Sequence, residues 1–220
     1  MAASSNDHGA DVGLRELKKQ RTRELIAETA RRLFAEGGFE RVTVAEVARA
    51  AEVSEQTVFN YFPTKEDLVY WRLEGFEEEL LRGIREREPG ESVLEAFGRF
   101  VLQQRGLLAE QDPAVRERLS ELTRMITQSP ALLARERQIF ERYTRSLAAL
   151  IADDTGASAD DIEPWVTANA LIGVHRALID YTRARILAGE PSARIRRAVR
   201  ARGERALERL QRGLSDYALK

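Results

Sequence analysis

Apolar residues recur with the period of an α-helix along nearly the whole chain. Leu25, Ile26, Ala30 and Leu33 show the spacing, which puts apolar side chains on one face of a helix. No stretch alternates apolar and polar residues for long enough to predict a strand. The prolines fall between the periodic segments, where a missing N–H and a fixed φ are tolerated. The pattern therefore predicts an all-α fold.

Capping signals divide these periodic stretches into separate helices. Ser92 with Glu95 has the spacing of a capping box, and Asp112 and Ser129 each stand before a proline that can open a helix. We expect helix four to be continuous and to join two parts of the chain rigidly. The predicted helices lie near residues 15–36, 44–50, 54–61, 65–87, 92–110, 113–127, 130–152, 162–187 and 192–214.

Composition excludes several classes of protein. The chain has 220 residues, of which 43% are hydrophobic, enough for more than one small recognition module. It has no cysteine, which excludes a disulfide scaffold, a thiolate zinc site and a cysteine nucleophile. The longest uncharged run, residues 164–175, is shorter than the ~20 residues that a membrane-spanning helix requires. Because the first fourteen residues also lack the apolar core of an export signal, we expect a cytoplasmic protein with no membrane partner.

The most specific part of the sequence is residues 37–65. Thr43 and Glu46 have the spacing of a capping box and begin a short helix, and Ser54 begins another after a break at residues 51–53. Two short helices separated by such a turn form a helix-turn-helix. The residues expected to pack inside it are Val47, Ala48, Ala51, Val58 and Phe62.

The outward face of the second short helix carries side chains that suit the major groove of DNA. Gln56 can pair bidentately with adenine, Glu55 can accept from cytosine N4, and the Thr57 methyl group can contact a thymine methyl group. The alternative is a small helical corner whose polar residues merely face water. Phosphate contacts are expected from Thr43, Tyr61 and Lys65. The predicted DNA-binding site comprises Thr43, Ser54, Glu55, Gln56, Thr57, Phe59, Asn60, Tyr61 and Lys65.

Residues 21–67 closely resemble the N-terminal domain of TetR/AcrR-type transcriptional regulators. The resemblance implies a three-helix DNA-binding domain with a helix-turn-helix, joined by the fourth helix to a larger helical domain for ligand binding and dimerisation. The expected domains are a disordered tail over 1–14, the DNA-binding domain over 15–64 and the effector and dimerisation domain over 65–220. The motifs that carry the resemblance are Gly37-Gly38-Phe39, Thr43-Val44, Val47-Ala48, Ala51, Val53-Ser54, Thr57-Val58-Phe59, Tyr61-Phe62 and Lys65-Glu66-Asp67-Leu68.

Glu52 departs from the family's pattern, which usually has glycine in this turn. A residue with a side chain must either adopt a sparsely populated backbone conformation there or reshape the turn. Glu55 is a second departure, because relatives often have a basic or small residue at this position.

The larger domain offers candidates for a ligand site and for a dimer interface. Tyr143, Asn169 and His175 place polar groups on otherwise apolar faces, as in a mostly apolar cavity with a few polar contacts. An ordinary core or surface role fits these three residues equally well. The resemblance implies a small lipophilic effector, for which an acyl-CoA-like molecule is one candidate, and a dimer formed by the last two helices, with Leu207 and Leu210 among the interface residues. The predicted ligand-binding residues are Phe97, Val101, Met125, Phe140, Tyr143, Trp165, Asn169 and His175.

Catalytic motifs are missing from the sequence. It has only two histidines and no phosphate-binding loop, dinucleotide-binding motif or HExxH metal motif. We therefore predict no catalytic residue, no metal site and no cofactor. The predicted function is a homodimeric, ligand-responsive DNA-binding regulator, a repressor that an effector releases from an inverted-repeat operator in double-stranded DNA. The alternative is a helical enzyme or lipid carrier with an appended DNA-binding corner.

Overall fold

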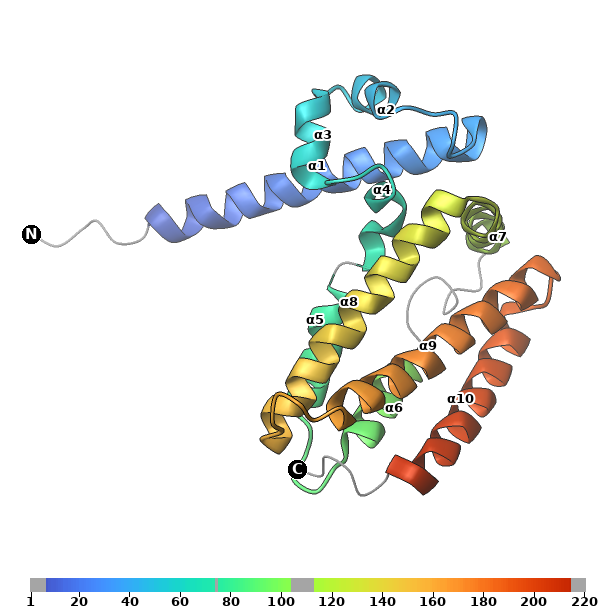
Figure 1. Ribbon diagram of the computed structural model, residues 1–220. Coiled ribbons are helices and arrows are strands. Elements are labelled where there is room, and N and C mark those ends of the chain that lie inside the picture. The colour runs from blue at the N-terminus through green and yellow to red at the C-terminus, as the bar shows by residue number, and fades with distance from the viewer. Residues whose placement is uncertain (1–6, 74, 104–112, 215–220) are drawn as a thin grey trace, which may run out of the picture. The chain divides into compact units, whose positions relative to one another are not determined.

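The computed structural model in Figure 1 describes residues 7–73, 75–103 and 113–214. Over these residues the protein is built from helices and has no strand, so the all-α prediction is confirmed. The chain divides into two compact units, Met1–Glu74 and Gly75–Lys220. No helix in the described ranges is long and apolar enough to cross a membrane.

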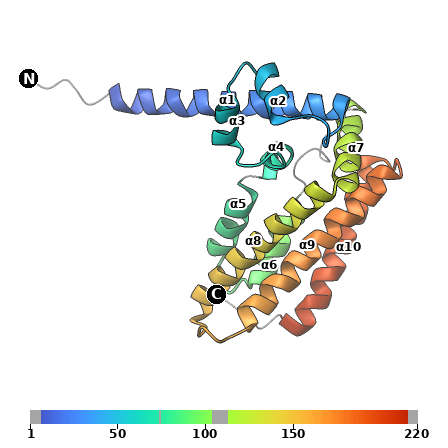
Figure 2. The same ribbon diagram turned by 45° about the horizontal axis from the view of Figure 1, so that its top comes forward.

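The first unit is a small helical domain built around its long first helix. Both α2 and α4 contact α1, and α3 packs against α2 (Figure 2). The apolar faces meet in a core that includes Ile26, Phe34 and Phe62, and the ring of Phe39 meets that of Phe34 edge-on at 5.1 Å between centroids. Its elements are α1 (Asp7–Gly37), α2 (Val44–Ala50), α3 (Glu55–Tyr61), α4 (Asp67–Tyr70) and the short 3-10 helix η1 (Trp71–Leu73).

Helix α1 begins earlier than the sequence suggested. Residues 7–14, expected to belong to a disordered tail over 1–14, are helical in the structure, whereas residues 1–6 lie outside the described ranges. No proline interrupts residues 7–37. Because each residue added to an existing helix gains a backbone hydrogen bond without a new nucleation step, the helix extends towards the N-terminus.

The prediction of one continuous helix over residues 65–87 was wrong. In the structure α4 ends at Tyr70 and η1 at Leu73, and α5 (Phe76–Arg85) is a separate helix. Gly75 has a φ of +80°, in the left-handed region. A right-handed helix cannot pass through that conformation, which glycine adopts without the steric cost of a Cβ atom.

The second unit is a bundle of long helices in which α8, α9 and α10 lie side by side (Figures 1 and 2). The predicted capping box of Ser92 and Glu95 is present, and the Ser129 hydroxyl accepts from the Leu132 N–H before α8. The expected helix over 92–110 ends at Val101 in the structure, and residues 104–112 are outside the description. After α5, the helices are α6 (Val93–Val101), α7 (Pro113–Gln128), α8 (Pro130–Thr155), α9 (Glu163–Leu187) and α10 (Ser192–Leu214).

An ion pair joins α8 to α9 inside this bundle. The two terminal nitrogens of Arg183 donate to the two carboxylate oxygens of Glu136 at 2.8 and 2.5 Å. Only 13% of the Arg183 side chain and 10% of the Glu136 side chain are exposed. A buried pair of this kind loses hydration, and two-point geometry is what offsets that loss.

Helix α10 packs closely on its own subunit through glycine. A Cβ atom added to Gly98 on α6 would lie 2.8 Å from the Leu207 Cδ1 atom of α10. Leu207, predicted at the dimer interface, therefore packs within the subunit. The outer side of α10 is strongly basic, because the helix has eight arginines and two glutamates, a net charge of +6 (8 − 2). One of these arginines, Arg202, lies over the ring of Tyr181 at 4.4 Å from its centroid.

The turn between α2 and α3 contains Glu52 with a φ of +56°, the one non-glycine residue with positive φ among the described residues. The backbone of Glu52 thus adopts the sparsely populated left-handed conformation, and the turn keeps its shape. We expect Glu52→Gly to raise the free energy of unfolding by about 0.5–1 kcal/mol, because glycine adopts this conformation without the Cβ clash.

Urea unfolding monitored by circular dichroism measures this effect. Glu52→Ala is the matched control, since it removes the same charge but keeps the Cβ atom. An equal gain in both variants would assign the effect to charge and contradict the backbone explanation.

Candidate nucleic-acid interface and effector site

Local capping fixes the two helices of the helix-turn-helix. The Thr43 hydroxyl accepts from the Glu46 N–H at 3.2 Å, and a Glu46 carboxylate oxygen accepts from the Thr43 N–H at 2.7 Å. These hydrogen bonds, the backbone one first, lower the pKa of Glu46. The five residues expected inside the motif are all buried: Val47, Ala48, Ala51, Val58 and Phe62.

The face of α3 opposite this core is open. Glu55, Gln56, Phe59 and Asn60 are exposed, and the Phe59 ring is 43% exposed although it is apolar. A large exposed aromatic residue among polar side chains is typical of a contact surface. Six of the nine predicted DNA-binding residues therefore lie on one short helix, whereas Ser54 caps it, Thr43 caps α2 and Lys65 follows α3. The six are Glu55, Gln56, Thr57, Phe59, Asn60 and Tyr61.

Several of these side chains already form hydrogen bonds with each other. The Ser54 hydroxyl accepts from the Thr57 N–H at 3.0 Å and lies 2.8 Å from the Thr57 hydroxyl. Gln56 Nε2 donates to Asn60 Oδ1 at 3.1 Å. The amide of Gln56 is thus held in place on the helix surface, which favours a defined contact over an adaptable one.

Lys65, predicted to contact a phosphate, contacts two aromatic rings and a carbonyl oxygen within the protein. Its Nζ atom lies 4.4 Å from the ring centroid of Phe39 and 5.8 Å from that of Phe34. The same atom donates to the Glu40 carbonyl oxygen at 3.4 Å. Because a cation over an aromatic face is attracted by the ring, Lys65 stabilises the loop after α1.

An aromatic cluster in the second unit connects α5, α8 and α9. The ring of Phe76, the first residue of α5, stacks on His175 at 4.9 Å and 12° and on Tyr143 at 5.4 Å and 27°. Phe140 meets the rings of Tyr143 and His175 edge-on. Three predicted ligand residues, Phe140, Tyr143 and His175, are therefore brought together.

Two of these groups are polar but uncharged near neutral pH. Burial raises the pKa of the Tyr143 phenol to about 12 and lowers the pKa of the His175 imidazole to about 4. No other residue of the described ranges forms a hydrogen bond with the imidazole of His175. The side chain is partly exposed, so its nitrogens are open to a polar group from outside the protein.

The other predicted ligand residues take no part in the ring contacts described for this cluster. Trp165 is 44% exposed, and the exposed Asn169 donates from Nδ2 to the Trp165 carbonyl oxygen at 2.8 Å. Both lie on the outer face of α9, so the expectation that they line an internal cavity does not fit the structure. Phe97 is fully buried, and Val101 and Met125 are partly buried.

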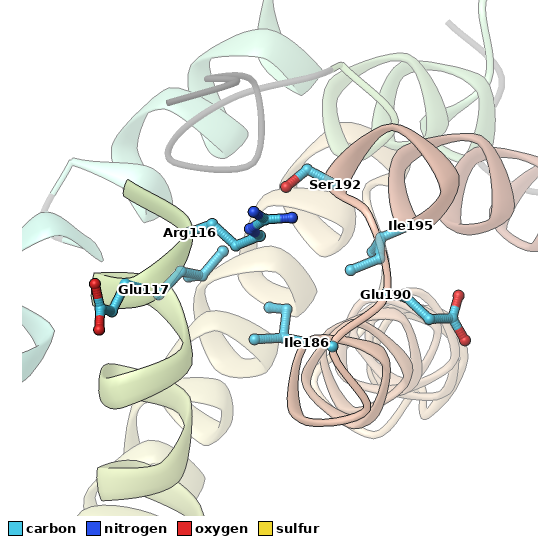
Figure 3. A pocket seen from close by; sticks show the side chains of 8 residues that line it. Arg116, Glu117, Ile186, Glu190, Ser192 and Ile195 are labelled. Carbon is cyan, nitrogen blue, oxygen red and sulfur yellow. The ribbon is translucent and has the colours of Figure 1, made fainter. Parts of the chain in front are cut away.

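A separate pocket of about 470 Å³ opens beside the turn between α9 and α10 (Figure 3). Its apolar lining includes Ile186 and Ile195, and the side chains of Arg116 and Ser192 point into it, whereas that of Glu190 points away. None of the predicted ligand residues lines this pocket, whose lining is Arg116, Glu117, Leu119, Ile186, Gly189, Glu190, Ser192 and Ile195.

Phe76 belongs to the aromatic cluster but was not predicted from the sequence as a site residue. It follows Gly75 and precedes three glutamates, Glu77–Glu79. The glycine before it was the available signal for a helix break, but isolated glycines are tolerated inside helices. Its contact with His175 joins residues far apart in the chain, which no local pattern predicts.

Two known sequence families match this chain. Residues 26–70 match the family described as bacterial regulatory proteins, tetR family, and residues 91–214 match the MftR C-terminal domain. The transcriptional regulator TcmR of Streptomyces glaucescens is 32% identical over 154 residues, 68% of this chain and 67% of TcmR. MftR of Mycobacterium tuberculosis, named for regulation of mycofactocin biosynthesis, is 27% identical over 175 residues, 76% of this chain and 81% of MftR.

Solved structures share the fold. NalD, described as the secondary repressor of an efflux pump in Pseudomonas aeruginosa, superposes with a TM-score of 0.53 at 18% identity, covering 85% of this chain and 97% of NalD. SmeT in a complex with triclosan gives a TM-score of 0.53 at 15% identity, covering 88% and 91%. At this identity the likeness concerns the architecture alone.

The lowered pKa of His175 predicts a loss of stability in acid. Between pH 6.5, the ordinary pKa of the group, and about pH 4, its approximate pKa in the folded chain, the His175 imidazole is protonated in the unfolded chain and neutral in the folded one. The free energy of unfolding should therefore fall as the pH drops through this window, by about 2 kcal/mol at pH 4.5. The charged groups nearby are Arg142 and Glu77 beside Tyr143 and Arg176 over Phe140, and they are the same in the wild type and in a chain without the imidazole.

Urea unfolding of the wild type and of His175→Phe at pH 7 and pH 4.5 isolates this contribution as the difference between the two chains. NMR titration of the imidazole gives its pKa directly. A measured pKa near 6.5, with the same pH dependence in both chains, would contradict the prediction.

Proposed function

We propose that this chain, which belongs to the TetR family of bacterial regulatory proteins, is a repressor that leaves its operator DNA when a small lipophilic effector binds the second unit. It would act in the bacterial cytoplasm, where its DNA lies. TcmR and MftR, two of its matched relatives, are named as transcriptional regulators, a class that acts by binding DNA and not by catalysis.

The observation that carries this proposal is the exposed face of α3. A short helix fixed by a capped turn presents Gln56, Asn60 and Phe59 to solvent, while Val58 and Phe62 hold it to the core. The N-terminal part of a second helix in such a motif reads base edges in the major groove. Fluorescence anisotropy with DNA from upstream of the gene tests this function, and equal binding to random DNA would count against a specific operator.

The second unit supports an effector role through its aromatic cluster. Phe140 and Tyr143 are buried, and His175 offers the one polar group there without a hydrogen bond from the described residues. A mostly apolar site with one or two polar contacts suits a lipophilic molecule. An acyl-CoA-like effector stays a prediction, and Arg176, which lies over the Phe140 ring at 5.5 Å from its centroid, is the cation beside the cluster that could contact its phosphates.

The outer face of α9 supports a homodimer. Ile162 is 71% exposed, Val166 51% and Trp165 44%, and Gly173 and Ala177 continue the same face with small side chains. Three large exposed apolar side chains on one face, with Asn169 as the polar residue among them, are typical of a contact surface, and small residues allow a second helix to approach closely. A two-fold dimer would read an inverted repeat with half-sites about one helical turn apart, or multiples of it.

Gln56 should determine base preference at one position. We expect Gln56→Ala to weaken binding to the best operator by about 1–3 kcal/mol and to relax the preference at a single base pair, because a bidentate contact is lost. The measurement is anisotropy against the operator and its single-base variants.

Gln20→Ala is the matched control for this test. Gln20 also lies exposed on a helix and donates to a residue four positions on, Glu24, at 2.9 Å. Its replacement should leave the base preference unchanged. Equal loss of affinity for every sequence in Gln56→Ala would reduce Gln56 to a general contact.

Gly173→Arg should produce monomers that remain folded. Within the described subunit a Cβ atom at Gly173 meets nothing within 4 Å, and arginine favours a helix more than glycine does. The charged side chain would therefore disturb only a partner helix. Leu207→Glu is unsuitable, because Leu207 packs on Gly98 inside the subunit.

Analytical ultracentrifugation measures the result, and Gly213→Arg on α10, where added atoms also meet nothing nearby, is the control. An unchanged dimer in Gly173→Arg would place the interface away from this face of α9.

A further inference from the structure

The ring of Phe76 lies in a site surrounded by other aromatic rings. It lies against two rings at once, His175 at an interplanar angle of 12° and Tyr143 at 27°, with Phe100 edge-on at 5.4 Å. Stacked and edge-on contacts of this kind favour a planar π-system over an aliphatic chain.

Phe76 is also one of the two partly exposed members of the cluster, the other being His175. Its side chain is partly exposed, whereas Tyr143 is 2% and Phe140 5% exposed. It directly follows Gly75, whose left-handed conformation has open space around it in the described structure. The ring can therefore leave the cluster towards solvent without displacing the residues behind it.

The imidazole of His175 adds a polar requirement. Its nitrogens form no hydrogen bond with the described residues, although the ring lies between aromatic neighbours. A phenylalanine ring cannot supply the missing partner. An aromatic molecule with a hydroxyl or carbonyl group can, and it would bury the same area.

We propose that Phe76 holds the place of the effector, and that a flat, neutral aromatic molecule with a hydroxyl or carbonyl group binds against Tyr143 and His175 by displacing that ring. This inference rests on the proposed function, in which the second unit binds the effector. It names the ligand class and adds Phe76 as the residue through which the site responds.

Displacement of Phe76 changes the first turn of α5. That turn is tied to α8 at two places, by the stacked ring and by Glu77, which accepts from Arg142 at 2.7 Å and from Ser146 at 2.5 Å. When the ring leaves, its stacking contact with α8 is lost, while Glu77 still contacts α8 two residues after Gly75, where the second unit begins in the chain. Binding is therefore coupled to the connection between the two units.

The test uses the full chain with 2-naphthol as the aromatic probe and dodecanoyl-CoA as the acyl probe. We expect Phe76→Ala to bind 2-naphthol about tenfold more tightly than the wild type, because no ring must be displaced from its contacts. The probe should shift the His175 imidazole signals in the NMR spectrum of both chains. It should weaken DNA binding of the wild type and leave that of Phe76→Ala unaffected.

Two further variants keep the test decisive. Phe76→Leu retains apolar bulk without a flat ring, so it should fold as the wild type does and still bind 2-naphthol more tightly. Phe100→Leu removes an edge-on ring of the same size without emptying the stacked place, so it should not tighten binding.

Unchanged or weaker 2-naphthol binding in both folded Phe76 variants would overturn the proposal. A shift of the His175 signals by dodecanoyl-CoA and none by 2-naphthol would also overturn it, in favour of an acyl effector. Failure of the unliganded wild type to bind any DNA would instead refute the proposed function, and the binding and NMR results would still judge the aromatic site separately.

Discussion

The packing of α8 against α9 is the contact on which the second unit depends. It carries both the two-point ion pair of Glu136 with Arg183 and the ring contacts of His175 with Phe140. Removing one member of a buried ion pair leaves an uncompensated charge, which costs far more than replacing both members. If the proposed effector binds at the aromatic cluster, it acts on the same helix pair that this ion pair holds together.

In the first unit, folding and DNA recognition use the same side chains. Ser54 and Thr57 use their hydroxyl groups in the N-terminal cap of α3, so the methyl group of Thr57 stays its expected contact with a base. Gln56 is oriented by Asn60 and keeps its remaining amide groups exposed. Preorganised side chains lose less freedom on binding, which favours Gln56 as the specific contact.

The helix-turn-helix could be predicted from the sequence because caps act between residues three positions apart. Thr43 and Ser54 therefore placed the starts of α2 and α3 to within a residue. The effector site could not be predicted in the same way. Helix α9 is apolar on more than one side, so periodicity did not show that Trp165 faces outward while Leu171 faces the core. The contact of Phe76 with His175 depends on the break at Gly75, whose local pattern also fits a continuous helix.

The charge of α10 also has a consequence for how the protein behaves on a column. The whole chain has a net charge of −1, which suggests weak retention by any ion exchanger. Helix α10 alone nevertheless has a net charge of +6. At low ionic strength that field extends well beyond the surface, whereas at physiological salt it is screened within about 8 Å. A nearly neutral protein should thus bind a cation-exchange resin through α10 and elute as the salt concentration rises.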